Sequence, residues 1–465
     1  MRKGTPKAFL YAALLLSIGN AVATPYKFTN LYDSSGPFNG FGAPSLNNSG
    51  TVAFSASRDK GEQGILTGSG GLTTTIADTS GPFNGLSSPS LNNRGTVAFR
   101  ASLDTGGAGI FTGSGGPITT IADSTSFEAG VPFQGLFSDP SLNDSGMVAF
   151  YFEMRSPDSP NIVGIYTGAG GPITTIVDTS TTNNDFFLGG TPSLNNSGTV
   201  AFPEDGDGIF IARGGTITNV TDNAFYSFFE SPSLNDSGTV AFVAGVFLDA
   251  ADILTDSGPF AFAPPPVCER QDVKGIFTSS GGPLTTIAHC FPVFTPLIPS
   301  LNNSGTVVFL AENLITGGAG IFTGPDLAAD KVIGAGDTLF GSTVADLLMS
   351  IESLNDSGQI AFLYSLADGR TGIARADPIT PAPEPGTLPL LIAALLGAVW
   401  GCDARANRRS YRQMLCFSEL REAAIFCCSA VARTPSTNCT PRMTSASCSK
   451  PLSRRNDFSA HLASL

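Results

Sequence analysis

Histidine is almost missing from this chain, which has two in 465 residues, His289 and His461. A Ser-His-Asp triad or a histidine-based metal site therefore has almost nothing to build with. Sequence motifs of the G-x-S-x-G or H-E-x-x-H type, or a phosphate-binding loop, are also missing from any suitable context. These absences predict that the protein is not an enzyme and that it holds no metal through imidazole.

Basic residues are scarce and unevenly placed. Only 14% of all residues are charged, and the net charge is −13. Residues 402–465 hold ten of the 25 Lys and Arg and four of the 38 Asp and Glu, so this tail carries +6 and the remaining chain −19. An acidic body offers no electrostatic footprint for nucleic acid. We therefore expect no nucleic-acid partner, and the acidic body would suit an extracellular protein.

Cysteine is equally scarce in the body of the chain, because six of the eight lie beyond residue 400. The other two, Cys268 and Cys290, flank the hairpin of a single repeat unit. In an exported protein such a pair is a candidate disulfide. The sequence leaves the pairing open, because a disulfide also requires a suitable Cα separation.

The N-terminus has the three parts of a secretory signal peptide. Met1, Arg2, Lys3 and Lys7 supply a basic region, and Ala8 to Ile18 is an apolar run too short to span a bilayer. Ala21-Val22-Ala23 then provides small residues at a cleavage site. We predict a signal peptide at residues 1–23 and a mature chain that begins at Thr24.

An internal repeat dominates the rest of the sequence. The string PSLNNSGTVAF at Pro44 returns with few changes at Pro89, Pro140, Pro192, Pro232 and Pro299, and as ESLNDSGQIAF at Glu352. The leading asparagines are 45, 51, 52, 40, 67 and 53 residues apart. They are Asn47, Asn92, Asn143, Asn195, Asn235, Asn302 and Asn355. The chain thus contains seven units.

Each unit predicts four short strands. PSLN and TVAF are joined by an Asn-Asn-Ser-Gly or Asn-Asp-Ser-Gly turn, and GIFTG and ITTIAD are joined by a glycine-rich turn. Alternation in TVAF puts Val52 and Phe54 on one face and Thr51 and Ala53 on the other. Large and small faces of this kind suit a sheet packed between two neighbours. Four strands in 40–50 residues is the period of a β-propeller blade.

The two ends of the repeat region are complementary. The seventh unit has its first three strands, at Ser353–Asn355, Gln359–Phe362 and Gly372–Arg375, and lacks the fourth. Tyr26–Asp33 supplies a sequence like that missing strand at the mature N-terminus. A strand that closes the last blade removes exposed sheet edges, whereas a linear β-solenoid, the alternative, has no need of this offset. We predict an all-β fold, a seven-bladed β-propeller closed by its N-terminal strand.

The repeated turns raise the question of calcium. Asn-Asp-Ser-Gly turns and the aspartates at Asp78, Asp123, Asp178 and Asp222 supply oxygen ligands. Calcium takes six to eight oxygens from a compact loop, and these carboxylates are too sparse for such a loop. We interpret the asparagines as structural Asx turns and expect no cofactor, with calcium binding as the alternative.

The C-terminal segment combines three signals. Residues 378–386 form a proline-rich linker that contains Pro383-Glu384-Pro385, and an apolar run from Thr387 to Gly401 follows. Arg405, Arg408, Arg409 and Arg412 come next, as at the cytoplasmic end of a short membrane helix. This order resembles the PEP-CTERM sorting signal of exported bacterial proteins. The resemblance implies a transient membrane anchor at residues 387–412, recognition by an exosortase-type sorting protease, and delivery to the cell surface or extracellular matrix.

The repeats are also similar to tandem N-x-x-G-x-x-A-F proteins that often carry such anchors, with Asn47 to Phe54 as the first match. The resemblance implies a repeat pattern and no activity. Such proteins usually end soon after the arginines, whereas this chain continues through residues 413–465, which we expect to be an atypical disordered tail. The predicted propeller spans residues 24–377.

Two classes of function fit these features. The first, which we favour, is a non-catalytic surface or matrix protein whose propeller binds a polysaccharide or a surface protein. The second is a secreted propeller enzyme such as a glycosidase or lyase. An enzyme should break the repeat in one unit by placing acids, His or Arg near the central axis. The units are uniform apart from the loops at 151–161, 180–187 and 247–272.

Overall fold

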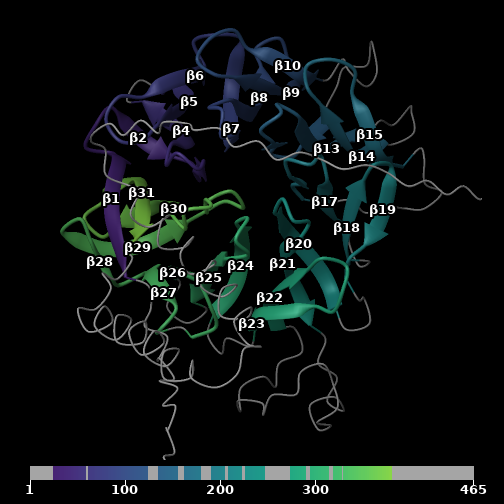
Figure 1. The fold of residues 1–465 in the computed structure, drawn as a ribbon. Coiled ribbons are helices and arrows are strands. Elements are labelled where there is room, and N and C mark those ends of the chain that lie inside the picture. Colours follow the sequence, from purple (N-terminus) through teal and green to yellow (C-terminus); the bar gives the residue numbers. More distant parts are fainter. Residues whose placement is uncertain are drawn as a thin grey trace, which may run out of the picture. The chain divides into compact units, whose positions relative to one another are not determined.

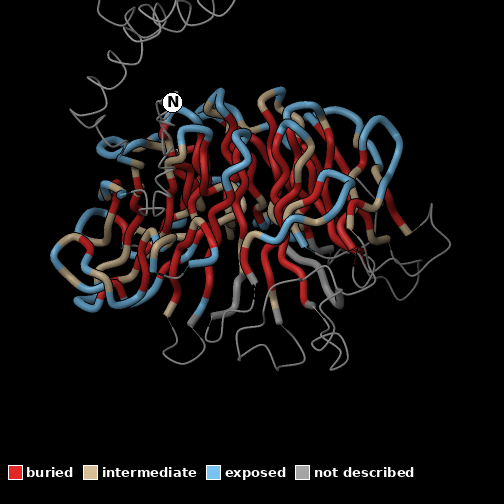
Figure 2. Tube along the Cα trace, turned by 60° about the horizontal axis from the view of Figure 1, so that its bottom comes forward, coloured by how far each residue is buried: buried red, intermediate tan, exposed pale blue. Residues whose placement is uncertain are grey.

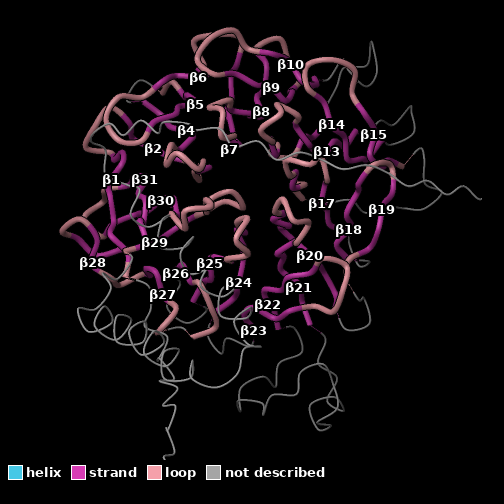
Figure 3. Tube along the Cα trace, viewed as in Figure 1, coloured by secondary structure: helices cyan, strands magenta, loops and turns pink. Residues whose placement is uncertain are grey.

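A computed structural model describes residues 25–58, 61–123, 135–154, 162–179, 190–204, 208–221, 226–246, 273–289, 294–313, 318–326 and 328–379. These residues form seven antiparallel β-sheets arranged in a ring (Figure 1). Strands and the loops between them make up all of this described part, which contains no helix (Figure 3). The prediction of a seven-bladed β-propeller is confirmed.

The blades follow one another along the chain. Blade 1 contains β2 (Phe38–Phe41), β3 (Ser45–Leu46), β4 (Val52–Arg58), β5 (Gln63–Gly68) and β6 (Thr74–Asp78). Blade 2 contains β7 (Phe83–Leu91), β8 (Val97–Leu103), β9 (Ala108–Gly113) and β10 (Thr119–Asp123). Blade 3 contains β11 (Gly135–Phe137), β12 (Ser141–Leu142), β13 (Val148–Met154), β14 (Ile162–Gly168) and β15 (Thr174–Asp178). Blade 4 contains β16 (Ser193–Leu194), β17 (Val200–Glu204), β18 (Gly208–Arg213) and β19 (Thr216–Asn219).

The remaining blades repeat this plan. Blade 5 contains β20 (Tyr226–Leu234), β21 (Val240–Val246), β22 (Val273–Ser279) and β23 (Thr285–His289). Blade 6 contains β24 (Phe294–Leu301), β25 (Val307–Asn313), β26 (Gly318–Phe322) and β27 (Lys331–Gly334). Blade 7 contains β28 (Thr338–Leu339), β29 (Ser342–Leu348), β30 (Ile360–Leu366), β31 (Thr371–Pro378) and, from the other end of the chain, β1 (Tyr26–Asp33).

The N-terminal strand closes the ring as the sequence predicts. β1 pairs antiparallel with β31, from Tyr26 opposite Pro378 to Asp33 opposite Gly372. Beyond the last pair, the backbone N–H of Ile379 donates to the carbonyl of Pro25 at 2.8 Å. The two ends of the propeller therefore lie side by side. Pairing of β1 covers the outer edge of blade 7, which would otherwise present unpaired backbone groups.

The hydrophobic core lies between the blades, as the alternation in the repeat predicts. Val52 and Phe54 of blade 1 pack with Ala361 and Ile373 of blade 7. Ala53, on the opposite face of the same strand, packs in the cluster shared with blade 2. Clusters of this kind fill all seven junctions. Figure 2 shows the result, with buried residues along the middle of the blades and exposed residues in the turns.

The prediction was wrong in detail for the innermost strands. In blade 2 the inner strand β7 begins at Phe83, six residues before the PSLN motif. In blade 7 the inner strand is β29, and the predicted strand at Ser353–Asn355 contributes only an isolated bridge between Leu354 and Ile360. The backbone turns between β29 and that bridge, and this turn carries Glu352 toward the ring axis.

Several predicted segments lie outside the described residues. They include the signal peptide at 1–23, most of the proline-rich linker, the hydrophobic helix, the arginine cluster and the tail. Cys268 and Cys290 also lie outside them. Within the described part of the chain, no helix is long and apolar enough to cross a membrane.

Candidate functional site

The seven leading asparagines form a closed ring around the central channel. The side-chain amide of each donates to the backbone carbonyl of its counterpart in the next blade, over 3.0–3.3 Å. The side-chain oxygen of each accepts from backbone N–H groups of its own turn, as Asn47 does from Ser49 and Thr51. Each side chain thus satisfies an Asx turn and ties two blades together. All seven are buried, with 3–5% of their surface exposed.

The next residue in each turn forms a second, exposed ring. Its side-chain oxygen accepts the backbone N–H of the corresponding residue in the preceding blade, over 2.8–2.9 Å. This ring consists of Asn48, Asn93, Asp144, Asn196, Asp236, Asn303 and Asp356. Asn and Asp both present an oxygen to the neighbouring blade, which explains why the repeat accepts either residue here. The three aspartates place negative charge around the channel mouth.

A third ring is built from the serines of the PSLN motif. The Ser hydroxyl accepts the backbone N–H of the Leu in the next blade at six junctions, over 2.9–3.0 Å. At the seventh junction the backbone N–H of Leu46 donates instead to the carbonyl of Glu352 at 2.9 Å. The exception arises because blade 7 replaces the regular inner strand with a turn.

That turn closes the channel. Ser45 and Ser90 each donate a hydroxyl to the Glu352 carboxylate at 2.8 Å, and Ser141 donates at 3.4 Å. Ser233 and Ser300 donate to the carbonyl of Ile351 at 3.1 and 3.0 Å. Blades 1, 2, 3, 5 and 6 therefore all hold a segment that comes from blade 7. The turn is a plug across the axis of the ring.

Glu352 has an unusual electrostatic environment. Desolvation disfavours its charged form and raises its pKa to about 7, although hydrogen bonds from Ser90, Ser45 and Ser141 act in the opposite direction. A cavity of about 150 Å³ lies between the plug and the mouth of the channel, lined by the asparagine rings, the inner leucines and Glu352. A carboxyl group with a pKa near 7 that lines a cavity is a feature of functional sites and also of structural networks.

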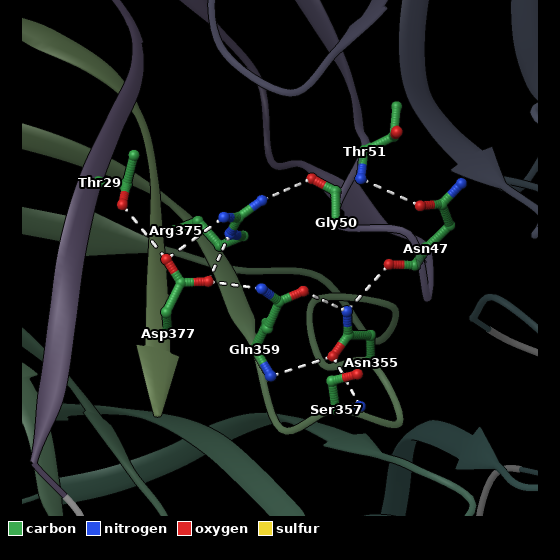
Figure 4. Close-up of polar contacts among 9 residues, drawn as sticks. All are labelled: Thr29, Asn47, Gly50, Thr51, Asn355, Ser357, Gln359, Arg375 and Asp377. Atoms are coloured by element: carbon green, nitrogen blue, oxygen red, sulfur yellow. Dashed lines mark hydrogen bonds and ion pairs between the residues drawn. The ribbon is translucent and has the colours of Figure 1, made fainter. Parts of the chain in front are cut away.

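The seam between the last and first units carries a further polar network (Figure 4). Arg375 forms an ion pair with Asp377 at 2.7 Å and donates to the carbonyl of Gly50 in blade 1 at 2.9 Å. Asp377 also accepts from Thr29 of β1, and from Gln359, which in turn accepts from Asn355 of the inner ring. The network thus joins the closing strand, blade 7 and blade 1.

The sequence singled out the seven asparagines and missed Glu352. The signal was present, because the seventh motif begins with Glu where the other six begin with Pro. The sorting motif Pro383-Glu384-Pro385 and the flanking Arg405, Arg408 and Arg409 lie outside the described residues. Within the described ranges, no three His, Cys, Asp or Glu side chains are grouped so that they could hold a metal ion.

Sheet pairing, closure and the central channel define a seven-bladed β-propeller of tandem asparagine-turn repeats. Residues 46–326 match a family of unknown function, DUF7453. The match spans more than half of the chain, so the chain belongs to this family. A search of curated proteins gives no match.

Solved structures with a similar fold are distant in sequence. YCF48 bound to D1 peptide is 10% identical, with a TM-score of 0.36 over 77% of this chain and 100% of that one. YCF48 from Cyanidioschyzon merolae is 10% identical, with a TM-score of 0.38 over 76% and 99%. An uncharacterized protein from Listeria monocytogenes EGD-e is 9% identical, with a TM-score of 0.37 over 70% and 89%.

Proposed function

We propose that this chain is an exported cell-surface or extracellular-matrix protein whose propeller is a non-catalytic binding and display module. In this proposal a signal peptide directs export, and the C-terminal PEP-CTERM segment anchors the chain until an exosortase-type protease releases it. The partner is an extracellular polysaccharide or a surface protein.

One structural observation carries the proposal. The backbone N–H of Ile379, just after the last strand, donates to the carbonyl of Pro25, just before the first strand, and so brings the two ends of the propeller together. The predicted cleavage site after Ala23 lies just before this point, and the proline-rich linker at 378–386 starts there. A closed domain that fits between two predicted export segments is what a displayed module requires. The linker would then hold a rigid body near the membrane surface.

Localisation together with mass spectrometry of the mature ends tests the proposal. The full-length chain would be expressed in a Gram-negative host that has an exosortase, and each cell fraction would be analysed. We expect a surface or extracellular protein that begins at Thr24 and ends near Pro385. A variant with Pro383, Glu384 and Pro385 replaced by alanine should keep Thr24 as its first residue and lose C-terminal processing. An intact chain ending at Leu465 in the cytoplasm would refute the proposal.

Glu352 supports a second candidate, a secreted enzyme acting on polysaccharide. It is the acid near the axis that breaks the repeat, and its pKa of about 7 suits a general acid. A glycosidase needs a second carboxylate, and Asp144, Asp236 and Asp356 share the lining of the same cavity. Measuring the release of reducing ends from bacterial exopolysaccharides separates the two candidates. Turnover by the wild type that Glu352→Gln abolishes would establish the enzyme and overturn the display module.

A further inference from the structure

A second cavity lies away from the central channel, at the junction of blades 1 and 2. It has a volume of about 240 Å³ and is lined by β2, β4 and β5 of blade 1 and by Leu86 of β7 in blade 2. Ser55 and Ser57 face it from β4, and Phe41 and Gly42 border it on the side of β2.

One repeat position at the cavity has a small side chain only in blade 1. The residue after the VAF motif points into the junction with the next blade and is Ser55 in blade 1. The other six units place larger residues there, namely Arg100, Tyr151, Pro203, Val243, Leu310 and Leu363. Tyr151, Val243 and Leu310 are buried in the core clusters of their junctions. Ser55 leaves the corresponding space open.

A second repeat position, that of Gly42, also has a smaller residue in blade 1 than in blades 2 and 3. Ser87 of blade 2 and Ser138 of blade 3 correspond to Gly42 of blade 1. Ser87 accepts from the Arg100 side chain at 3.0 Å, and Ser138 accepts from the backbone N–H of Tyr151 at 3.0 Å. Arg100 also reaches across to the carbonyl of Phe137 in blade 3 at 3.2 Å. Blade 2 thus pairs two side chains at these positions, and blade 3 pairs a serine hydroxyl with the backbone of a bulky residue, whereas Gly42 and Ser55 leave room in blade 1.

The chemistry of the lining indicates a neutral, hydroxyl-bearing ligand. Ser55 and Ser57 offer hydroxyl groups, and the exposed Gln63 offers an amide with donors and an acceptor. Leu86, which is partly exposed and packs in the cluster between blades 1 and 2, adds apolar surface. The Phe41 ring packs on the other face of blade 1, against Phe38 and Phe54. The described residues that line the cavity include no ionisable side chain. A site without charge gains nothing from a charged ligand, which would lose its hydration on binding.

The volume of the cavity limits the size of the ligand. Pockets for drug-sized molecules have volumes of roughly 300–1,000 Å³, so this smaller cavity has room for about one ring. A pyranose ring presents hydroxyl groups at its edge and C–H groups on its face. The hydroxyl groups match Ser55, Ser57 and Gln63, and the C–H groups match the apolar side chain of Leu86.

We propose that the junction of blades 1 and 2 binds a single neutral sugar residue, as a terminal or exposed unit of a polysaccharide. The inference rests on the proposed function as a binding module and names its ligand class and its site. It does not depend on export, since the cavity is a property of the folded propeller.

Saturation-transfer NMR on the full-length protein tests the site. The probes are the methyl glycosides of D-glucose, D-galactose, D-mannose and L-rhamnose at millimolar concentration, a range expected for a contact with one ring. We expect at least one glycoside to receive magnetisation. Ser55→Val should abolish this signal, because it removes a hydroxyl group and adds apolar bulk in the cavity, and it should fold normally because Val243 occupies the same position in blade 5.

A matched pair of variants provides the control. Ser57→Val places a methyl-bearing side chain in the cavity and should weaken binding at least tenfold. Ser102→Val makes the same change at the equivalent position of blade 2, where the side chain is exposed and lies outside the cavity. It should leave binding unchanged.

Two results would overturn the inference. One is that none of the four glycosides receives magnetisation, and the other is that the signal survives in both Ser55→Val and Ser57→Val. Either could occur in a protein that is exported as proposed, so this failure is distinct from failure of the localisation experiment. Appearance of new reducing ends in the same assay with an oligosaccharide would instead point to the enzyme.

Discussion

The side-chain amide of Asn355 donates to the backbone carbonyl of Asn47 at 3.0 Å, across the seam where the last unit meets the first. The same bond links every other pair of neighbouring blades. The seam is therefore chemically equivalent to the other six junctions at the inner ring. It differs in the serine ring, where the N–H of Leu46 donates to the carbonyl of Glu352, and in the ion pair of Arg375 and Asp377.

The ring of buried leading asparagines, such as Asn195, should contribute more to stability than the exposed ring formed by the next residue of each turn, such as Asn196. Asn195→Ala removes the bond to Asn235 and leaves the N–H groups of Ser197 and Thr199 without their acceptor in a buried turn. We expect a loss of about 2–4 kcal/mol in the free energy of unfolding, measured with urea. Asn196→Ala, one residue along and exposed, should cost less than about 1 kcal/mol. Equal losses would contradict the assignment.

Two glycines in the left-handed region provide a second test. Gly50 has φ of 78° and Gly95 has φ of 83° in the equivalent turn of blade 2. A Cβ at Gly50 would lie 2.6 Å from a terminal nitrogen of Arg375, whereas a Cβ at Gly95 would meet no described atom within 4 Å. Gly95→Ala should cost about 1–2 kcal/mol through backbone strain. Gly50→Ala should cost measurably more, and a double variant with Arg375→Ala should remove the excess.

The ion pair at the seam should control how often the closing strand opens. Its side chains are 18% and 23% exposed, so it is better shielded from water than the pair of Arg58 and Glu62 at 38% and 48%. Asp377→Asn should accelerate hydrogen exchange at the amides of Tyr26–Asp33 more than elsewhere. Glu62→Gln should leave those amides unchanged. Uniform acceleration across all blades would show that the network does not act locally.

Glu352 predicts a specific dependence of stability on pH. Its folded pKa of about 7 exceeds its ordinary value of 4.5, so between these values the folded state binds a proton that the unfolded state has released. Stability from this group is therefore full below pH 4.5 and declines as the pH rises toward 7, by at most about 1.4 kcal/mol per pH unit. Glu352→Gln should remove this decline.

The contribution of Glu352 is isolated by measuring the free energy of unfolding against pH for the wild type and for Glu352→Gln. Asp33 and Asp368 have lowered pKa values and contribute the opposite trend, but they do so in both proteins. Hydrogen bonds from Ser35 and Asn30 lower the pKa of Asp33, outweighing its desolvation, and those from Arg370 lower that of Asp368. The difference between wild type and Glu352→Gln should thus vary with pH only between about 4.5 and 7. A constant difference would contradict the raised pKa.

Local chemistry explains what the sequence could predict. The turn at Asn47 to Gly50 is encoded within four residues, and the alternation of Val52, Ala53 and Phe54 assigns each side chain to a face. The complementarity of Tyr26–Asp33 with the incomplete seventh unit predicted ring closure. The turn and the alternation recur in every unit, and this repetition strengthened both predictions.

Contacts between blades were harder to predict from the sequence. The amide of Asn47 reaches a carbonyl 45 residues away, and nothing in a single unit identifies that acceptor. To predict the plug, one would have to know that Ser45, Ser90 and Ser141, which lie in three different units, all contact the same carboxylate. The exchange of Pro for Glu at residue 352 was visible, but its meaning depended on that convergence.

The pairing of β1 with β31 also sets an order of events during synthesis. The first strand of the propeller to be made has to wait for the last, about 340 residues later, before it gains a partner. Until then the nascent chain is an open stack of blades with unsatisfied backbone groups at both ends, a state prone to pairing with other chains. A chaperone or a membrane-bound export machinery that occupies Tyr26–Asp33 during this interval would decide between a closed ring and an aggregate.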